Sequence, residues 1–230
     1  MIQDLLHRIS RILLKLRLQP IRIFCLHEIS AKPEFSNEGP SDWMDINIFK
    51  QIIENMRKQG YKFISLEDAY RKIQTDRLRF RKYAVLTNDD GRISLHEILP
   101  WLIEQKLPIT LFINGNYTDG KEHVVTGFNP FHCLTKAELV QYVELSYGLI
   151  SLQGHGLEHK DATKISLEEF HRMIDPYKRF HAYTWGHHTI QTDNILRSYN
   201  IIPVFMDGMK NYNDASCIHR ELLENYDKYL

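Results

Sequence analysis

The sequence predicts one α/β domain built around a parallel β-sheet, which is either open or closed into a barrel. Two observations lead to this prediction. Strand-like and helix-like segments alternate along most of the chain, and repeated βα units give parallel strands. In addition, 230 residues with 43% hydrophobic content suit one ordinary globular domain that buries a substantial core.

The expected elements follow one another in a regular order. Short β-rich or apolar runs predict strands at residues 21–27, 61–64, 83–87, 108–113, 149–152, 180–183 and 201–205. Helical periodicity lies between them, at residues 46–59, 66–73, 95–105, 136–146, 167–174 and 193–199. Residues 32–43, rich in Pro, Ser, Gly and Asn, and residues 115–130 are predicted to be long loops, which in compact domains are often functional.

Residues 1–18 are predicted to form a separate amphipathic helix that precedes a catalytic domain at residues 19–230. One helical face carries the apolar side chains of Ile2, Leu5, Leu6, Ile9, Ile12, Leu13 and Leu16. The basic residues Arg8, Arg11, Lys15 and Arg17 lie mostly off that face. Such a helix could lie on a membrane surface, or it could pack on its own domain or on a second subunit.

The composition excludes several classes of protein. Lys plus Arg and Asp plus Glu are both 29, so there is no basic excess of the kind that binds nucleic acid. The three cysteines are odd in number and far apart, which predicts buried thiols in a reducing compartment. With no secretory signal and no apolar run of about 20 residues, we expect a cytoplasmic protein, with peripheral contact to the inner membrane surface through residues 1–18.

Polar and ionisable residues recur directly after the predicted strands. Asp89 and Asp90 follow one strand, His155 and His159 follow another, and further polar residues follow the others. Because the carboxyl ends of parallel strands share one edge of the sheet, these residues point to a common site.

The pairs Asp89-Asp90 and His155-x-x-x-His159 are the strongest chemical signals. Two adjacent carboxylates project in different directions, so they suit two different roles at one centre, although Asp-Asp-Gly is also good turn chemistry. Two histidines four residues apart can bind one metal, and one carboxylate with two histidines leaves a coordination position open for water and substrate. The same set also suits non-haem iron, and His155 to His159 matches the HxxEH pattern of inverse zinc proteases.

Taken together, these residues resemble the polysaccharide deacetylases, the NodB-homology group of carbohydrate esterases. The run Val85-Leu86-Thr87-Asn88-Asp89-Asp90-Gly91 looks like the TFDDG motif, and His155-x-x-x-His159 looks like H-[ST]-x-x-H. The run Ala182-Tyr183-Thr184-Trp185-Gly186 is similar to the third motif, and the segments 24–27, 108–113 and 218–220 resemble strands of the family. The resemblance covers roughly residues 20–224 and implies a distorted (β/α) barrel of seven to eight parallel strands.

The resemblance also implies roles for individual residues. Asp89 would be the catalytic base, and Asp90, His155 and His159 would bind a divalent metal, with Zn²⁺ expected and Co²⁺, Ni²⁺ or Mn²⁺ as alternatives. The backbone N–H near Trp185 would help to hold the oxyanion. His219 is the first candidate for the general acid, followed by His187 and His188. Polar residues at or beside the strand ends are expected to bind the substrate: His27, Asn114, Tyr183, Asp207 and Arg220.

The sequence departs from the family pattern at several positions. Asn88 replaces the usual Phe, Gly156 replaces Ser or Thr, and Thr184 replaces Pro. His181 stands where many members have Arg, and the Leu-x-His motif that often supplies the general acid has no clear match.

The expected activity is metal-dependent removal of acetyl groups from an N-acetylated or O-acetylated sugar. The substrate could be an oligosaccharide, a polysaccharide or a lipid-linked sugar. Two alternatives remain open at this point. The chain could be a sugar-binding protein that keeps the fold without catalysis, or a zinc hydrolase of the HxxEH type.

Overall fold

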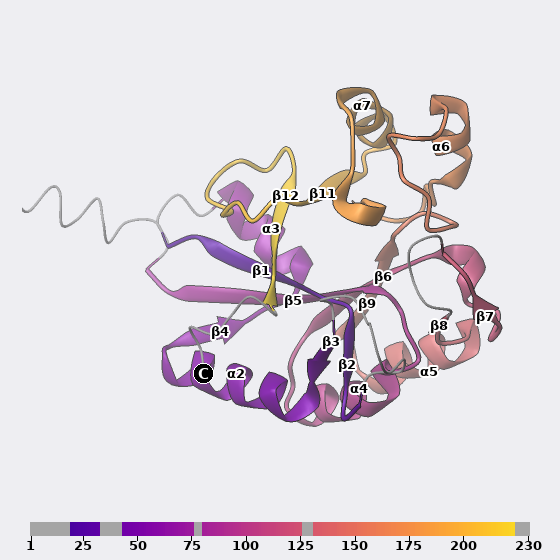
Figure 1. The fold of residues 1–230 in the computed structure, drawn as a ribbon. Helices are drawn as coiled ribbons and strands as arrows, with labels where there is room; N and C mark the ends of the chain where they lie inside the picture. Colours follow the sequence, from indigo (N-terminus) through magenta and orange to yellow (C-terminus); the bar gives the residue numbers. More distant parts are fainter. Residues whose placement is uncertain (1–18, 33–42, 76–79, 126–130, 224–230) are drawn as a thin grey trace, which may run out of the picture.

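A computed structural model describes residues 19–32, 43–75, 80–125 and 131–223 (Figure 1). The predicted helix at residues 1–18 lies outside this part of the chain. All strands and helices expected between residues 21 and 205 are present, with their ends displaced by at most three residues. Among the described residues, no helix combines the length and the apolar character needed to cross a bilayer.

Seven parallel strands close into a barrel, which confirms the predicted fold. The ring runs through β1 (Ile21–Leu26), β5 (Lys82–Asp90), β6 (Ile109–Ile113), β9 (Ile150–Gly154), β10 (Phe180–Ala182), β11 (Ile202–Met206) and β12 (Ile218–Leu222). β12 then pairs with β1 and closes the ring. An eighth strand, β4 (Tyr61–Phe63), pairs in parallel with the beginning of β5.

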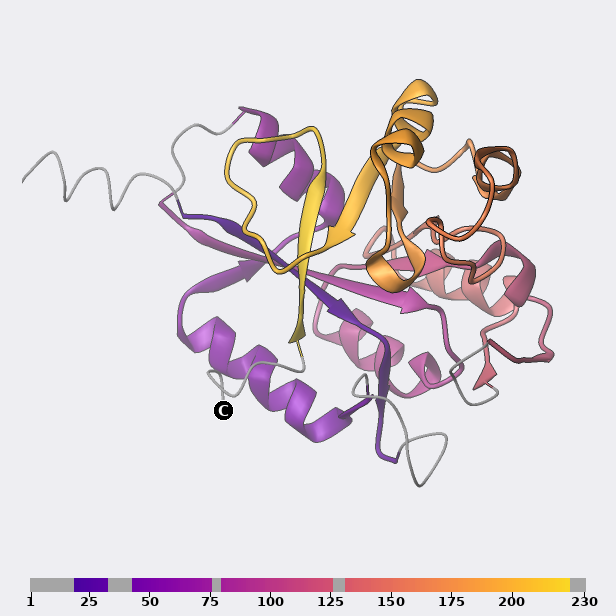
Figure 2. The same cartoon turned by 45° about the horizontal axis from the view of Figure 1, so that its top comes forward.

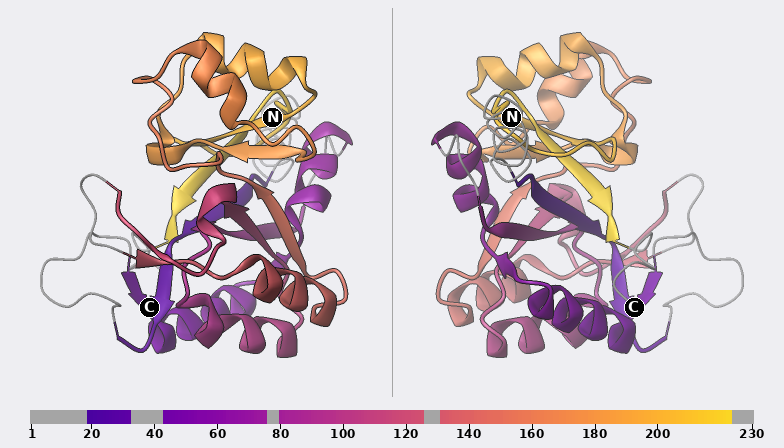
Figure 3. Two further views of the ribbon diagram at one scale, coloured as in Figure 1. Left: turned by 90° about the vertical axis from the view of Figure 1, so that its right-hand side faces the viewer. Right: turned by 90° about the vertical axis from the view of Figure 1, so that its left-hand side faces the viewer.

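Helices surround the barrel and extend its hydrophobic core. They are α2 (Ile46–Lys58), α3 (Leu66–Thr75), α4 (Leu95–Glu104), α5 (Lys136–Leu145), α6 (Leu167–Met173) and α7 (Ile190–Ser198). Figures 2 and 3 show α6 and α7 on one side of the molecule, with α2, α4 and α5 on the opposite side. Polar caps define several helix starts. α7 begins three residues earlier than expected because Thr189 and Thr192 form a reciprocal capping box.

Alternation along the strands separates the barrel interior from the layers under the helices. On β5, Val85 packs in a cluster with Ile23 of β1 and Phe112 of β6. Its neighbours Ala84 and Leu86 pack instead with residues of α2 and α4. The same alternation continues to the end of β5, where Thr87 and Asp89 fall on the inner face with Val85.

Two predicted loops contain short regular elements, so these predictions were incomplete. Residues 43–45 form β3 (Trp43–Asp45), which pairs in parallel with β2 (Glu28–Ser30); Trp43 Nε1 donates to Ser30 Oγ over 3.0 Å. The second loop contains a 3-10 turn, η1 (Gly115–Tyr117), and the strand β7 (Glu122–His123), which pairs with β8 (Phe131–His132). Elements of two or three residues have too little periodicity to be recognised in a sequence.

Candidate active site

Asp90, His155 and His159 bring three ligand atoms together at the carboxyl ends of β5 and β9. These atoms all lie within 4.8 Å of one another. Asp90 Oδ1 is 3.5 Å from His155 Nε2 and 3.4 Å from His159 Nε2. Both distances exceed an ordinary N–H···O hydrogen bond. They match the spacing of about 3.4 Å between two ligands of one tetrahedral ion with bonds of about 2.1 Å.

The two histidines present the nitrogen that a metal requires. His155 Nδ1 donates to the carbonyl oxygen of Ala182 over 2.8 Å, which leaves the lone pair of Nε2 directed at Asp90. Burial lowers the pKa of His159 to about 4, although the charge of Asp90 acts to raise it. This imidazole is therefore neutral near pH 7. Burial also disfavours the charged form of His155, but Asp89 and Asp90 outweigh it and raise its pKa. The carboxylates therefore favour a cation at this position.

The second oxygen of Asp90 faces a buried arginine that the sequence motifs did not single out. Arg92 Nη2 lies 3.3 Å from Asp90 Oδ2, and Arg92 Nη1 lies 3.6 Å from Glu28 Oε2. Asp90 Oδ1, on the histidine side, is buried and accepts no hydrogen bond from the described residues. A buried carboxylate oxygen without a donor is costly unless a cation binds it, so the residues fit a metal ion.

Asp89 points into the barrel and forms a bidentate ion pair with Arg220 of β12. Arg220 Nη1 and Nη2 donate to Asp89 Oδ1 and Oδ2 over 2.6 Å and 2.8 Å, and Nη1 also lies 3.1 Å from Thr87 Oγ1. Burial alone would raise the pKa of Asp89, but the charges of Arg220 and His155 and the bonds from Arg220 lower it to about 2. Asp89 is therefore a buried, fixed and ionised carboxylate.

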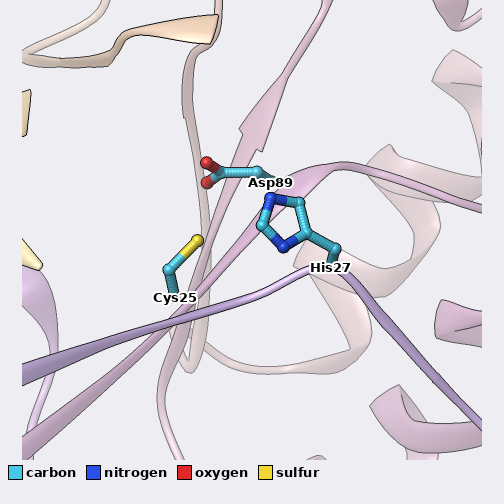
Figure 4. Close-up of side chains that lie close together, drawn as sticks. All are labelled: Cys25, His27 and Asp89. Carbon is cyan, nitrogen blue, oxygen red and sulfur yellow. The ribbon is translucent and has the colours of Figure 1, made fainter. Parts of the chain in front are cut away.

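His27 and Cys25 lie beside Asp89 at the end of β1. Figure 4 shows the three side chains gathered between β1 and β5, and one ligand atom of each lies within 4.8 Å of the others. This group could also be considered as a metal site. However, both oxygens of Asp89 already accept from Arg220, so the arrangement suits proton transfer better than metal binding. The sequence predicts only a substrate-binding role for His27.

The structure does not bring all predicted site residues into this cluster. Asn114 is buried, and its side chain donates to the carbonyl oxygen of His155 over 2.6 Å. It therefore stabilises the loop that carries His155 and His159. Tyr183 is also buried, and its hydroxyl donates to Asp193 of α7 over 2.8 Å. Asp207 Oδ2 lies 2.7 Å from Nδ1 of His219, on the outer side of β12.

Trp185, in contrast, lies at the cluster. Its ring meets that of His159 edge-on, with the ring centroids 5.2 Å apart, and 42% of the residue is exposed. It belongs to the 3-10 turn η2 (Thr184–Gly186) and has φ of 62°, an unfavourable conformation for a bulky residue. This strain marks the turn as a segment whose shape is imposed by its surroundings.

Of two interpretations left open by the sequence, one disagrees with the structure and one agrees with it. The segment from His155 to His159 is a loop, and Glu158 pairs with Lys160 over 2.9 Å, so the helical HxxEH site is wrong. The turn expected for Asp-Asp-Gly is present, because Asp90 has φ of 71° and the Gly91 N–H donates to the carbonyl oxygen of Asp89 over 2.9 Å. The turn is buried at the end of β5, where both aspartates are 3% exposed and pair with β6.

Two departures from the motifs have a structural explanation. Gly156 has φ of 82°, and a Cβ there would lie 3.1 Å from the carbonyl oxygen of Glu158, so Ser or Thr would be strained. Asn88 faces away from the barrel interior, and its side chain donates to the carbonyl oxygen of His27 over 2.5 Å. Asn88 thereby fastens the end of β1, which carries His27, to β5.

The fold is shared with solved structures of low sequence identity. The deacetylase PplD of Streptococcus pyogenes, solved in complex with acetate, is 22% identical with a TM-score of 0.73; the match covers 90% of this chain and 94% of that one. IcaB from Ammonifex degensii is 18% identical with a TM-score of 0.72, covering 92% and 96%. A de-N-acetylase from Aggregatibacter actinomycetemcomitans is 14% identical with a TM-score of 0.70, covering 92% and 100%.

Sequence comparison supplies independent evidence. No curated protein sequence matches the chain. The family model for polysaccharide deacetylase matches residues 79–193, which is half of the chain and includes the aspartate pair and both histidines. The chain therefore belongs to the polysaccharide deacetylase family.

Proposed function

We propose that this protein is a metal-dependent deacetylase that removes acetyl groups from an acetylated sugar, with Asp90, His155 and His159 as the metal ligands. The observation that carries the proposal is the spacing of 3.4–3.5 Å between Asp90 Oδ1 and the two Nε2 atoms. A divalent ion held there would act as a Lewis acid toward a water molecule and the acetyl oxygen. Zn²⁺ is the metal we propose, with Co²⁺, Ni²⁺ and Mn²⁺ as alternatives.

Asp89 is suited to accept the proton of the attacking water. Its carboxylate is ionised and fixed by Arg220, and it lies 3.9 Å from the Nε2 atom of His155, next to the ligand cluster. The low pKa of Asp89 means that it carries no proton when the water approaches. A fixed base of this kind loses little entropy in reaching the transition state.

His27 is better placed than His219 to protonate the leaving amine or alcohol. His27 is near Asp89, on the inner side of the barrel end, whereas His219 and Arg220 project to opposite faces of β12. Because Arg220 points at Asp89, His219 points away from it. We therefore propose His27 as the proton donor and retain the backbone N–H of Trp185 as the proposed oxyanion donor.

Acetate release from the purified full-length chain tests the proposal. The substrates are N- and O-acetylated oligosaccharides and polysaccharides and a lipid-linked acetylated sugar, and the metal content is measured by elemental analysis. We expect acetate release that stops with a chelator and returns with added Zn²⁺. A metal-loaded chain that binds these sugars but releases no acetate would instead support a sugar-binding protein.

The location in the cell and the role of residues 1–18 stay predictions from the sequence. We propose that this basic amphipathic segment brings the enzyme to the inner surface of a membrane, where a lipid-linked substrate would lie. Full-length chain and a variant without residues 1–18 should be compared for binding to vesicles of anionic lipids. Equal binding by the two proteins would contradict a role of residues 1–18 in membrane binding.

A further inference from the structure

A second cluster of reactive side chains lies on the outer face of β12. Cys217 Sγ is 3.4 Å from Nε2 of His219, and Nδ1 of the same ring is 2.7 Å from Asp207 Oδ2. Asp207 is itself held by the N–H of Met209 over 3.0 Å, and Asn211 Oδ1 accepts the backbone N–H of His219 over 2.9 Å. The order of groups is a thiol, an imidazole and a carboxylate that orients the imidazole. This is the arrangement that activates nucleophilic cysteines.

The imidazole in this cluster is positively charged near neutral pH. The hydrogen bond with Cys217 raises the pKa of His219 most, burial opposes the rise, and Asp207 adds to it, which brings the pKa to about 9. The charge of His219 also contributes to lowering the pKa of Asp214. A cation therefore faces the sulfur of Cys217 over 3.4 Å.

This cluster is separate from the candidate active site. His219 and Arg220 are adjacent in β12, so their side chains lie on opposite faces of the sheet, and Arg220 reaches Asp89 from the inner face. On the outer face, Cys217 packs in a hydrophobic cluster with Phe205 and Leu196. The proposed deacetylation uses none of these outer groups.

The accessibility of the cluster limits what can react there. Cys217 is 6% exposed, and the side chains of His219 and Asp207 are 14% and 35% exposed. A protein or polysaccharide could not reach the sulfur without rearrangement of the surroundings. The low exposure of the sulfur therefore restricts its reactants to small molecules.

We propose that Cys217 is a reactive thiolate that small peroxides oxidise to a sulfenic acid. The sulfur attacks one oxygen of the peroxide, an S–O bond forms and the O–O bond breaks. The sulfur is oxidised by two electrons, and the peroxide is reduced. With hydrogen peroxide, the leaving hydroxide takes the proton from the His219 imidazolium and departs as water, and Asp207 holds the ring in place for this transfer.

The test compares Cys217 with Cys133 inside the same folded chain. Cys133 is 3% exposed, so its burial is similar, but its sulfur donates to the backbone oxygen of Asp90 over 3.3 Å. Full-length protein is labelled with iodoacetamide between pH 6 and 9, and each cysteine is quantified by peptide mass spectrometry. We expect Cys217 to react about tenfold faster or more at pH 7 and to lose little rate at pH 6.

Variants and peroxide complete the experiment. In His219→Gln, whose fold is checked by circular dichroism, labelling of Cys217 at pH 7 should slow about tenfold, and labelling of Cys133 should not change. After treatment of the folded wild type with hydrogen peroxide, the chain is unfolded in urea that contains dimedone, and dimedone should then mark Cys217 and not Cys133. Equal labelling of the two cysteines overturns the proposal. Fast labelling without a dimedone adduct also overturns it, because the sulfenic acid would then not form.

Discussion

Arg220 and Asp89 are joined by two parallel hydrogen bonds that cross the interior of the barrel from β12 to β5. The side chains are 1% and 4% exposed, and the guanidinium also lies over the ring of Phe112, 5.0 Å from its centroid. The pair therefore links β12 to β5 across the barrel interior and fixes a carboxylate beside the ligand cluster at the same time. Packing and the proposed chemistry depend on the same contact.

Removing Arg220 should be much more costly than removing a comparable surface arginine. Arg220→Met leaves Asp89 buried without its partner, and we expect a loss of about 3–5 kcal/mol in the free energy of unfolding. Arg71→Met is the control, because Arg71 pairs with Asp68 on α3 and the two side chains are 70% and 43% exposed. We expect that control to lose about 1 kcal/mol or less. Urea unfolding measures both losses. Equal losses would show that burial of Asp89 does not make the removal of Arg220 more costly.

Asp89 and Asp90 should respond differently to substitution although they are adjacent. Asp89→Asn keeps the three proposed ligands, so metal content should stay at the wild-type level while turnover falls by about 100-fold or more. Asp90→Ala removes a ligand and should lose the metal as well as the activity. Asp68→Asn, on an exposed part of α3, serves as the control. Full activity in Asp89→Asn would eliminate this residue as the base.

His27 and His219 provide the test of the proton donor. His27→Gln should retain metal and lose about 100-fold in turnover, because the leaving group then departs unprotonated. His219→Gln should stay within about twofold of the wild type, since its ring bonds to Asp207 on the outer face of β12. Acetate release measured with both variants separates the candidates. If the two losses are reversed, His219 is the donor and the placement argued for His27 is wrong.

The βα alternation and the strand-end position of the polar residues could be predicted from the sequence. β5 was predicted to end at residue 87, yet it extends to Asp90, because its ladder with β6 continues through the polar residues. A hydrophobic pattern cannot show this extension, since the buried side chains there are carboxylates. Their burial depends on Arg220 and Arg92, which lie elsewhere in the fold or outside the recognised motifs.

The inward position of Arg220 could not be deduced for a related reason. His219 and Arg220 are neighbours, and a shift of one residue in the register of β12 would exchange their faces. The register is set by pairing with β11 and β1 after an irregular connection, so local sequence does not determine it. The position of His27 beside Asp89 likewise depends on the pairing of β1 with β5.

Gly156→Ser should lower the free energy of unfolding even though it restores a residue typical of the family. The backbone has φ of 82° there, and the added Cβ would lie 3.1 Å from the carbonyl oxygen of Glu158. Gly60→Ser is the control for the backbone conformation alone, because Gly60 has φ of 87° and nothing within 4 Å of its Cβ position. The left-handed backbone should cost each variant about 1 kcal/mol in the free energy of unfolding. Gly156→Ser should lose more than this because of the contact with Glu158.

The same substitution should also affect the ligand cluster. Gly156 lies between His155 and His159, so relief of the contact with Glu158 would move a ligand, and we expect metal affinity to fall about tenfold. Competition with a chelator measures this affinity. Wild-type affinity and stability in Gly156→Ser would show that the loop accommodates the side chain without strain.

His219 should hold its proton well above the pH at which an ordinary histidine loses it. The pKa of His219 is raised to about 9 by Cys217 and Asp207 in the folded chain, compared with about 6.5 for an unperturbed histidine. Between these values the imidazole is protonated in the native state and not in the unfolded state, so its own contribution to stability falls as pH rises. That contribution is fully present below about pH 6.5 and is lost as pH passes through about 9, whereas a thiolate at Cys217 contributes with the opposite sign. The proton on the ring is therefore measured directly, and an NMR titration of the His219 ring under reducing conditions should have its midpoint near 9. A midpoint near 6.5 would show that the imidazole does not hold its proton more tightly in the native state.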